Sequence, residues 1–323
     1  RHSTEPSGSV AHRAEDEHRA LHNAAAGHGM SRRSWLMLIA LSILWGAAYL
    51  VIELALRSFP PVVVVLGRVA LATVVLLPLA LHRKVLPPLL HHPWWVLITV
   101  LLQATAPLLL LTFGQQWLST GLTGILIGSQ PLFVALLALR FDPAERPHGI
   151  RGVFGLLLGF AGLALIFGVE IGGSPRVLLG GALVTGAALC YAAGSMLIHR
   201  KLAFAQPLGI ATAAMLVATT VLLVPGLLSL PATTPSMTSS LALLALGVVF
   251  TGFTLRLFYG LIAEAGPARA TLAFYLSPGV TVILGWLLLD ERISWSTVSG
   301  LVAIVAGSVL VANRATVQKR GQA

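Results

Sequence analysis

The chain has 323 residues, of which 56% are hydrophobic and only 10% are charged, and its mean hydropathy is +0.88. Soluble domains carry about 25% charged residues, so this composition excludes a soluble globular protein. The formal net charge of +10 would favour nucleic-acid binding in a soluble chain. Here the basic residues lie in short segments between apolar stretches, as membrane topology requires, and we expect no nucleic-acid partner.

A polar tail over residues 1–33 precedes the apolar stretches, and we predict that it is disordered. The tail has no apolar core of the kind that a signal peptide needs, and we expect Met30 to be the native start. The histidines of the tail, which are mixed with acidic residues, would indicate a metal site only if they clustered at ligand spacing; we favour a disordered tail and predict no metal or cofactor. The histidines are His2, His12, His18, His22 and His28.

Ten stretches are long and apolar enough to cross a membrane, which takes about 20 helical residues. We therefore predict an all-α membrane protein with ten transmembrane helices. The stretches cover 34–56, 61–81, 94–114, 119–140, 150–169, 178–198, 208–228, 240–262, 268–289 and 295–313.

The basic residues between these stretches predict their orientation, because cytoplasmic loops carry an excess of Lys and Arg. With both termini in the cytoplasm, the outside loops hold only Arg57, Arg176 and Arg292. Adding or losing one helix would destroy this asymmetry. We predict a multi-pass protein of a bacterial inner membrane with both termini inside. The inside residues are Arg32, Arg33, Arg83, Lys84, Arg140, Arg146, Arg151, Arg200, Lys201, Arg269, Arg314, Lys319 and Arg320.

The sequence repeats itself at an offset of about 145 residues, with small gaps. This divides it into a first repeat over 34–169, a second repeat over 178–313 and a basic tail over 314–323. Each repeat holds five helices, an odd number, so the two copies must have opposite orientations in the membrane. The matched pairs are Phe113 with Phe258, Gly121 with Gly266, Pro131 with Pro278, Glu145 with Glu291, Gly155 with Gly300 and Gly162 with Gly307.

The order of motifs resembles the EamA family of the drug/metabolite transporter superfamily, over nearly all of residues 34–313. Trp45, Gly46 and Arg68 carry the likeness in the first half, although the acidic turn there is interrupted by Pro143. The second half shows the pattern in Gly266-Pro267-Ala268-Arg269-Ala270, Pro278, Leu289-Asp290-Glu291-Arg292 and the glycines from Gly300 to Gly307. The resemblance implies a secondary transporter, and it implies that Arg68 is structural.

Ionisable residues inside a span are costly and are therefore candidates for function. Arg256 shares a helical stripe with Gly252, Tyr259 and Gly260, so its guanidinium is either a binding group for a substrate carboxylate or phosphate, or a structural group. Glu53 is either half of an ion pair with Arg57, four residues on, or a carboxylate that couples transport to protons. Arg68 is a further candidate partner for Glu53.

Polar and proline residues in the middle of helices are the remaining candidates. Pro131 and Pro278 predict two equivalent broken helices, which either surround a central site or only shape the packing. Ser129, Pro107 and Gly279 belong to the same pattern. The aromatic residues Phe258 and Tyr275 either line a cavity or are packing or interfacial groups. The predicted substrate contacts are Arg256, Tyr259, Trp45, Tyr49, Gln103, Gln130, Ser277 and Tyr191.

The sequence contains no phosphate-binding loop and no convergent catalytic motif, so we expect no enzyme activity. The leading prediction is a carrier that exports an amino acid or related metabolite. A proton-coupled exporter of cationic drugs and a flippase for lipid-linked sugars are the alternatives. Stripes of small residues such as Gly155 and Gly159 allow close helix packing, either within a monomer or in a homodimer.

Overall fold

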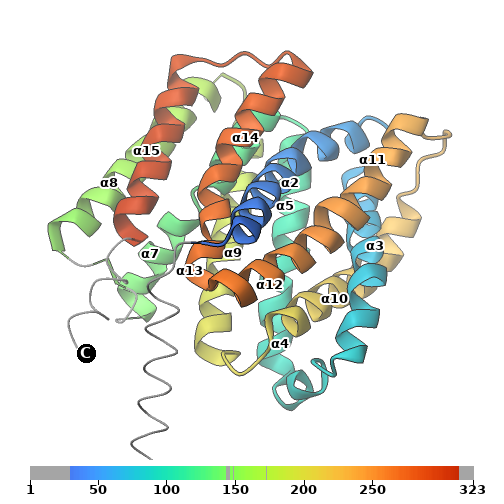
Figure 1. Cartoon of the computed structure of the whole chain (residues 1–323). Coiled ribbons are helices and arrows are strands. Elements are labelled where there is room, and N and C mark those ends of the chain that lie inside the picture. Colours follow the sequence, from blue (N-terminus) through green and yellow to red (C-terminus); the bar gives the residue numbers. More distant parts are fainter. Residues whose placement is uncertain (1–29, 143–145, 148, 172, 313–323) are drawn as a thin grey trace, which may run out of the picture.

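The computed structural model describes residues 30–312 apart from 143–145, 148 and 172. Every regular element in this part of the chain is helical (Figure 1). The N-terminal histidines and the C-terminal tail lie outside the described residues. The elements are α2 (Arg32–Leu56), α3 (Pro61–His82), η1 (Pro87–His91), α4 (Pro93–Val100), η2 (Leu101–Thr105), α5 (Ala106–Gln115), α6 (Thr120–Ile127), α7 (Gln130–Phe141), α8 (Gly149–Ile166), η4 (Phe167–Ile171), α9 (Pro175–Lys201), α10 (Pro207–Leu228), α11 (Met237–Gly247), η5 (Val248–Phe253), α12 (Thr254–Ala265), α13 (Pro267–Ala270), α14 (Leu272–Leu289) and α15 (Trp295–Ala312).

Nine helices in the described ranges are long and apolar enough to cross a membrane. They fall within a few residues of the predicted stretches; the segment predicted over 61–81 is Pro61–His82, for example. Several of these spans join two or three of the elements above, such as α4, η2 and α5 in Pro93–Gln115. The tenth predicted segment forms a shorter apolar helix, Trp295–Val311. The chain is therefore an all-helical, multi-pass membrane protein.

The helix ends follow from local sequence. Ser31, Ser119 and Ser236 precede α2, α6 and α11, and each side-chain oxygen accepts a hydrogen bond from the backbone N–H three residues on. Pro61 and Pro207 stand at the first positions of α3 and α10, where the missing N–H costs nothing. These residues therefore fix where each of the five helices begins.

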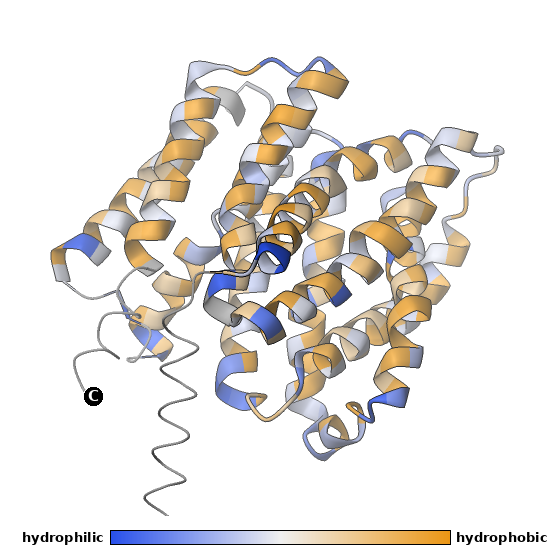
Figure 2. Ribbon diagram, in the orientation of Figure 1, coloured by the Kyte–Doolittle hydropathy of each residue, from blue (hydrophilic) through white to orange (hydrophobic). Residues whose placement is uncertain are grey.

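The outer surface of the bundle is apolar. Large hydrophobic side chains that would be buried in a soluble protein are exposed here, among them Leu157 at 66%, Val74 at 71% and Val302 at 60%. Hydrophobic residues predominate along most of the helices (Figure 2). Such a surface is stable only against lipid, so these faces contact the hydrocarbon of the membrane.

Helices α8 and α15, from opposite ends of the sequence, pack side by side at the edge of the bundle (Figure 1). Their backbones touch at glycines: a Cβ atom added at Gly307 would lie 2.5 Å from the carbonyl oxygen of Gly155 and 2.7 Å from the amide nitrogen of Gly159. In lipid, helices associate through such close packing rather than through a hydrophobic driving force. The glycine stripes are therefore used within the chain.

In the described chain three spans contain π-helical turns: η4 ends the fifth span, and the other two turns lie at related positions. Leu101–Thr105 (η2) interrupts the third span and Val248–Phe253 (η5) interrupts the eighth. A π turn inserts one extra residue into the helix, so side chains after it are rotated by about 100° relative to a continuous α-helix. The positions match under the internal repeat, and such turns occur often at functional sites.

The prediction of two equivalent broken helices is right for one helix and wrong for the other. The fourth span breaks between α6 and α7, just before Pro131. Helix α14 instead continues through Pro278 without interruption. The two prolines are nevertheless related in space, because Pro278 lies against the break in the fourth span. A Cβ atom added at Gly128, in that break, would lie 2.8 Å from Cγ of Pro278. The proline ring thus packs against the broken backbone of its counterpart.

Candidate functional site

The candidate site lies between helices of the two halves and is centred on Arg68 in α3. Arg68 is seven residues from the beginning of α3, which corresponds to about 10 Å along the helix. Its side chain is partly buried, and its Nε donates a hydrogen bond of 2.8 Å to Oγ1 of Thr251. Thr251 belongs to the π turn η5 and donates in turn to the carbonyl oxygen of Leu246. The π turn thus supplies the hydroxyl group that holds the guanidinium.

The two tyrosines Tyr49 and Tyr191 complete the surroundings of Arg68. Both lie close enough to the guanidinium, and to each other, for electrostatic interaction. They come from different halves, since Tyr49 is in α2 and Tyr191 is in α9. Arg68 has no ion pair within the described ranges, and its terminal nitrogens have no hydrogen-bond acceptor there. The site therefore presents an uncompensated positive charge beside two phenol groups.

A second cluster of polar side chains in the site connects the third and fourth spans to α9. Nε2 of Gln103 lies 3.1 Å and Nε2 of Gln130 lies 3.5 Å from Oγ of Ser195. Gln103 is in the π turn η2, and Gln130 is the first residue of α7, immediately after the break. The two irregularities of the first half thus bring two amide side chains to one hydroxyl group.

An aromatic cluster lies one helical turn from Tyr49. The ring of Trp45 stacks on Phe274 with centroids 4.4 Å apart, and it lies 5.1 Å from Phe258. Tyr259 extends the cluster, with its ring 5.7 Å from that of Phe258. The tryptophan comes from the first half and its partners from the second, so the cluster closes the space between α2, α12 and α14.

The structure brings together only part of the predicted substrate-binding set. Trp45 and Tyr259 belong to the aromatic cluster, Tyr49 and Tyr191 lie beside Arg68, and the two glutamines share Ser195. Ser277 is buried in α14, next to Thr281, whose hydroxyl donates to the carbonyl oxygen of Gly46 in α2. Tyr275 is partly buried in the same helix. The aromatic residues of this set are thus divided between the surroundings of Arg68 and the Trp45 cluster.

Arg256 occupies a different position from the one that its stripe suggested. Its side chain is exposed, and it forms no hydrogen bond or ion pair in the described part of the chain. Gly252, its supposed neighbour on the stripe, is buried against Val75 of α3. The π turn that contains Gly252 separates the two residues, which explains why a regular helical stripe misplaces them.

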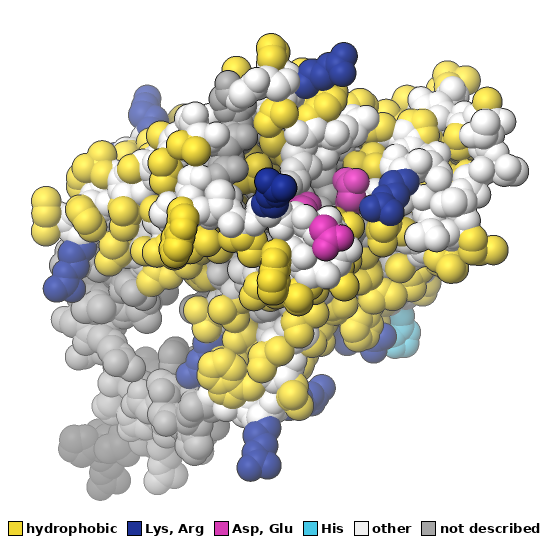
Figure 3. Space-filling view, turned by 90° about the horizontal axis from the view of Figure 1, so that it is seen from above, with side chains coloured by type: hydrophobic (Ala, Val, Ile, Leu, Met, Phe, Trp, Pro, Cys, Tyr) yellow, Lys and Arg dark blue, Asp and Glu magenta, His cyan; other side chains and the backbone are white. Residues whose placement is uncertain are grey.

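Glu53 forms no ion pair with either expected arginine among the described residues. Arg68 is bonded to Thr251 instead, and Arg57 is exposed and lies within electrostatic range rather than in contact. Glu53 also interacts electrostatically with Glu291, from the loop between α14 and α15. Acidic and basic side chains lie near one another on this face of the molecule (Figure 3). The partly buried Glu53 carboxylate is thus free of a direct salt bridge.

Two carboxylates join the halves at the N-terminal ends of helices α6 and α2. Glu291 accepts hydrogen bonds from the backbone N–H groups of Thr120 at 2.6 Å and Gly121 at 2.9 Å, the first residues of α6. The acidic turn therefore caps the N-terminus of α6. Near the start of α2, Glu264 accepts from the hydroxyl groups of Ser31 and Ser34, at 2.6 and 2.7 Å. It also lies 3.4 Å from Nε of Arg33.

Sequence reasoning missed Thr251, Ser195 and Phe274, although each has a detectable signal. Thr251 directly precedes Gly252, Phe274 lies four residues before Pro278, and Ser195 follows Gly194. None of these residues is charged, so a search for intramembrane ionisable groups passes over them. The described residues contain no group of three or more His, Cys, Asp or Glu side chains that would hold a metal ion.

The fold and the site together define a class of protein: a multi-pass membrane transporter with polar groups held between its helices. The sequence matches the EamA-like transporter family over residues 33–168 and again over residues 178–313. The chain therefore belongs to this family. The resemblance recognised in the sequence is thus confirmed.

Similar proteins agree with this assignment. The chain is 30% identical to the uncharacterized inner membrane transporter YedA of Escherichia coli K12, over 85% of this chain and 89% of the relative. It is 25% identical to the uncharacterized transporter YoaV of Bacillus subtilis, over 84% and 94%. A crystal structure with 18% identity shares the fold, with a TM-score of 0.62 over 88% of this chain and 99% of the other. The chain is a multi-pass protein of a bacterial inner membrane.

Proposed function

We propose that this protein is a secondary carrier that exports a small carboxylated metabolite, an amino acid or related compound, by alternating access of its two halves. It acts as a transporter and not as an enzyme. The observation that carries the proposal is the guanidinium of Arg68, held between the halves without an acidic partner in the described structure. A charged side chain inside a span costs about 2.5–3.5 kcal/mol on insertion scales, a cost that function must justify.

The chemistry of Arg68 favours a carboxylate over a cation as substrate. The hydroxyl oxygen of Thr251 accepts a hydrogen bond from Nε of Arg68. The two terminal nitrogens of the guanidinium therefore remain able to form parallel hydrogen bonds with one carboxylate. The phenol groups of Tyr49 and Tyr191 are neutral donors that add to this binding without repelling an anion. A cationic drug would meet a positive charge at the same place. We therefore assign the anion-binding role to Arg68, ahead of Arg256.

The other polar groups suit the rest of an amino-acid-like substrate. Gln103, Gln130 and Ser195 provide both donors and acceptors, as an ammonium or hydroxyl group requires. The aromatic cluster around Trp45 offers an apolar surface for a side chain. Because every part of this site combines residues from two halves or from two irregular turns, a relative movement of the halves would assemble and disassemble it.

The proposed architecture has ten transmembrane helices, as two inverted repeats over 34–169 and 178–313 with both termini in the cytoplasm. Three observations support it. The chain matches the family twice in sequence, the π turns η2 and η5 lie at related positions, and α8 packs against α15 through matching glycines. The protein works either as a monomer or as a homodimer, surrounded by membrane lipids.

Glu53 is the proposed coupling residue. It is partly buried, has no direct salt bridge in the described ranges, and lies within electrostatic range of a second carboxylate, Glu291. A carboxylate in such a position exchanges protons more readily than one held in an ion pair. Export of the substrate would then be driven by protons that enter through this residue.

The test is transport in proteoliposomes with a panel of radiolabelled amino acids and related carboxylates. Arg68→Ala should weaken the apparent affinity for the substrate by roughly 30- to 700-fold, which corresponds to about 2–4 kcal/mol for a lost charge-assisted pair. Arg68→Lys should recover only part of this, because an ammonium group lacks the planar pair of donors.

Arg256→Ala is the matched control, since it removes the same side chain from an exposed position. It should leave transport within about twofold of the unmodified protein. Unchanged carboxylate transport in Arg68→Ala would refute the anion site. Loss of transport in Arg256→Ala would return the role to that residue, and transport of cations alone, abolished by Glu53→Gln, would support a drug exporter.

A further inference from the structure

We propose that the pocket formed by η1 and the loop between α9 and α10 binds the phosphate group of an anionic phospholipid. The pocket has a volume of about 550 Å³ and is lined by Lys84, Pro87, Pro88, His91, His92 and Phe204. It lies where the α3–α4 connection meets the α9–α10 connection (Figure 1). The proposal depends on the membrane-spanning fold and is independent of the transported substrate.

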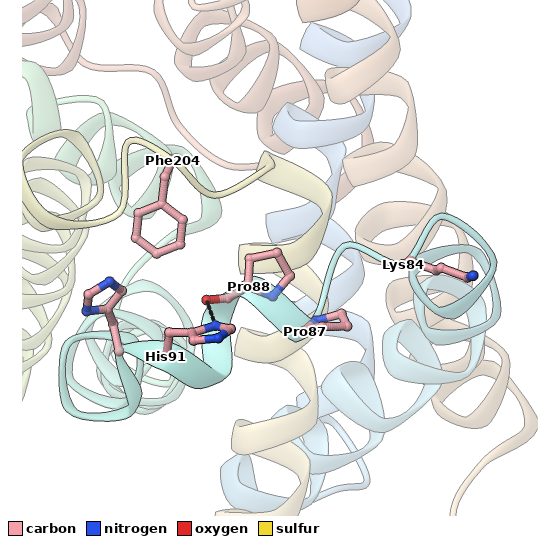
Figure 4. Close-up of a pocket in the computed structure, with 6 residues that line it drawn as sticks. Lys84, Pro87, Pro88, His91 and Phe204 are labelled. Atoms are coloured by element: carbon pink, nitrogen blue, oxygen red, sulfur yellow. Dashed lines mark hydrogen bonds between the residues drawn. The ribbon is translucent and has the colours of Figure 1, made fainter.

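The lining provides two kinds of surface. Pro87, Pro88 and the ring of Phe204 are apolar, while His91, His92 and Lys84 are basic. His91 and Phe204 lie on one side of η1, and Lys84 extends beyond Pro87 at the other end (Figure 4). The ring of His92 lies 5.2 Å from that of Phe204. A phospholipid has the same division, with an apolar glycerol and acyl region next to a charged phosphate.

The two stretches of sequence that line the pocket contain basic residues and no acidic residue. No aspartate or glutamate occurs in the sequence between Glu53 and Asp142, or between Glu170 and Glu264, and every lining residue falls in these two stretches. Arg83, Arg200 and Lys201 add exposed positive charges close by in the chain. A set of cations without a local acid attracts anions and has no internal partner to satisfy it.

The pocket is preformed rather than assembled from mobile side chains. Beneath it, Leu89 of η1, Leu202 of the loop and Ile210 of α10 form a small buried core, each less than 7% exposed. This core fixes η1 against the α9–α10 connection. The imidazole of His91 is further held by a contact of 3.4 Å between Nδ1 and the carbonyl oxygen of Pro88. A binding surface with its backbone already ordered loses little entropy when a ligand binds.

Lys84 occupies a backbone position that would suit glycine better. Its φ angle is 50°, in the left-handed region at the end of α3, where residues with a Cβ atom are disfavoured by about 1–2 kcal/mol. The amide of Lys84 donates to the carbonyl oxygen of Leu81, as expected for a helix terminus of this type. This left-handed position ends α3 and places Lys84 in the lining of the pocket.

The pocket also lies at the right depth for a lipid headgroup. Trp94 and Trp95 follow it directly at the beginning of α4 and are 74% and 39% exposed, and Leu90 of η1 is 77% exposed. Exposed tryptophans mark the boundary between hydrocarbon and headgroups. Nζ of Lys201 lies 4.8 Å from the centre of the Trp95 ring, which adds a cation at the same level. A phosphate at this level belongs to a lipid.

The experiment compares lipid binding by two triple variants of the full chain. Lys84→Gln/His91→Gln/His92→Gln removes the basic groups of the pocket, and Arg57→Gln/Arg176→Gln/Arg292→Gln removes the three exposed arginines predicted to lie on the other side of the membrane. Purified proteins in neutral detergent are titrated with phosphatidylglycerol or phosphatidylcholine. Bound lipid is counted by native mass spectrometry, and thermal unfolding is followed in parallel.

We expect phosphatidylglycerol to bind and stabilise both the unmodified protein and the arginine variant. The pocket variant should bind it at least about fivefold more weakly, since one cation near a lipid surface is worth about that factor. Phe204→Ser should also weaken binding, without any change of charge. Equal losses in both triple variants would overturn the proposal, as would equal binding of phosphatidylcholine. Protection by inorganic phosphate or glycerol phosphate alone would assign the pocket to a soluble ligand instead.

Discussion

Replacing Glu291 by glutamine tests the contact through which the α14–α15 loop holds the beginning of α6. Both carboxylate oxygens accept backbone N–H groups, from Thr120 at 2.6 Å and from Gly121 at 2.9 Å. A hydrogen bond to a charged group contributes about 1.5–3 kcal/mol to stability. Glutamine keeps one acceptor but turns an NH₂ group towards the second donor, and it removes the negative charge at the helix N-terminus.

We expect Glu291→Gln to lower the free energy of unfolding by about 2 kcal/mol, because Glu291 is partly exposed and its two bonds are weakened rather than all lost. For a chain of this length, that corresponds to a decrease of about 4 °C in Tm. The assay is thermal unfolding in detergent, followed by size-exclusion chromatography of the heated samples.

The matched control is Asp290→Asn, which removes the same charge one residue earlier. Asp290 is exposed and has a φ angle of 54°, a left-handed conformation that asparagine also tolerates. Its Tm should change by less than about 1 °C. If the two variants unfold at the same temperature, the Glu291 carboxylate does not stabilise α6 and the reasoning fails.

Two further predictions concern contacts between the halves. Gly307→Ala should lower the free energy of unfolding by about 1–3 kcal/mol, because its Cβ atom would overlap the backbone of α8. Gly279→Ala is the control: a Cβ atom there has open space, so this variant should be neutral or stabilising. Equal Tm values in the two variants would contradict the packing of α8 against α15. Glu264→Gln should speed amide hydrogen exchange over residues 31–38, because Ser31, Ser34 and Arg33 lose their charged partner; unchanged exchange would show that α2 is held by its apolar contacts alone.

The spans and the family could be predicted from the sequence because hydropathy and loop charge are one-dimensional properties. The sequence does not predict which residues of each helix face the interior of the bundle. Arg256 was assigned to the site because its spacing from Gly252 matches a regular helix, and the π turn η5 breaks that regularity. Nothing in the local sequence announces a π turn, since it is stabilised by tertiary contacts such as the bond from Arg68 to Thr251.

The two prolines illustrate the same limit. Pro131 and Pro278 are equivalent in the repeat, and each lacks the N–H group that a helix needs. Only the first lies at a break, and the ring of Pro278 from the other half packs against Gly128 in that break. A sequence comparison of the repeats reveals the symmetry of the prolines but not the asymmetric way in which they pack.

The bond between Glu291 and α6 has a consequence for the synthesis of the protein. Thr120 and Glu291 are separated by 171 positions in the chain. At about 5–20 residues per second, a ribosome needs roughly 10 to 35 seconds to make the intervening segment. During this time the N-terminus of α6 resides in the membrane without the carboxylate that later binds it. The N-terminal end of α6 therefore gains its cap only after residue 291 has been made, late in the synthesis of the chain.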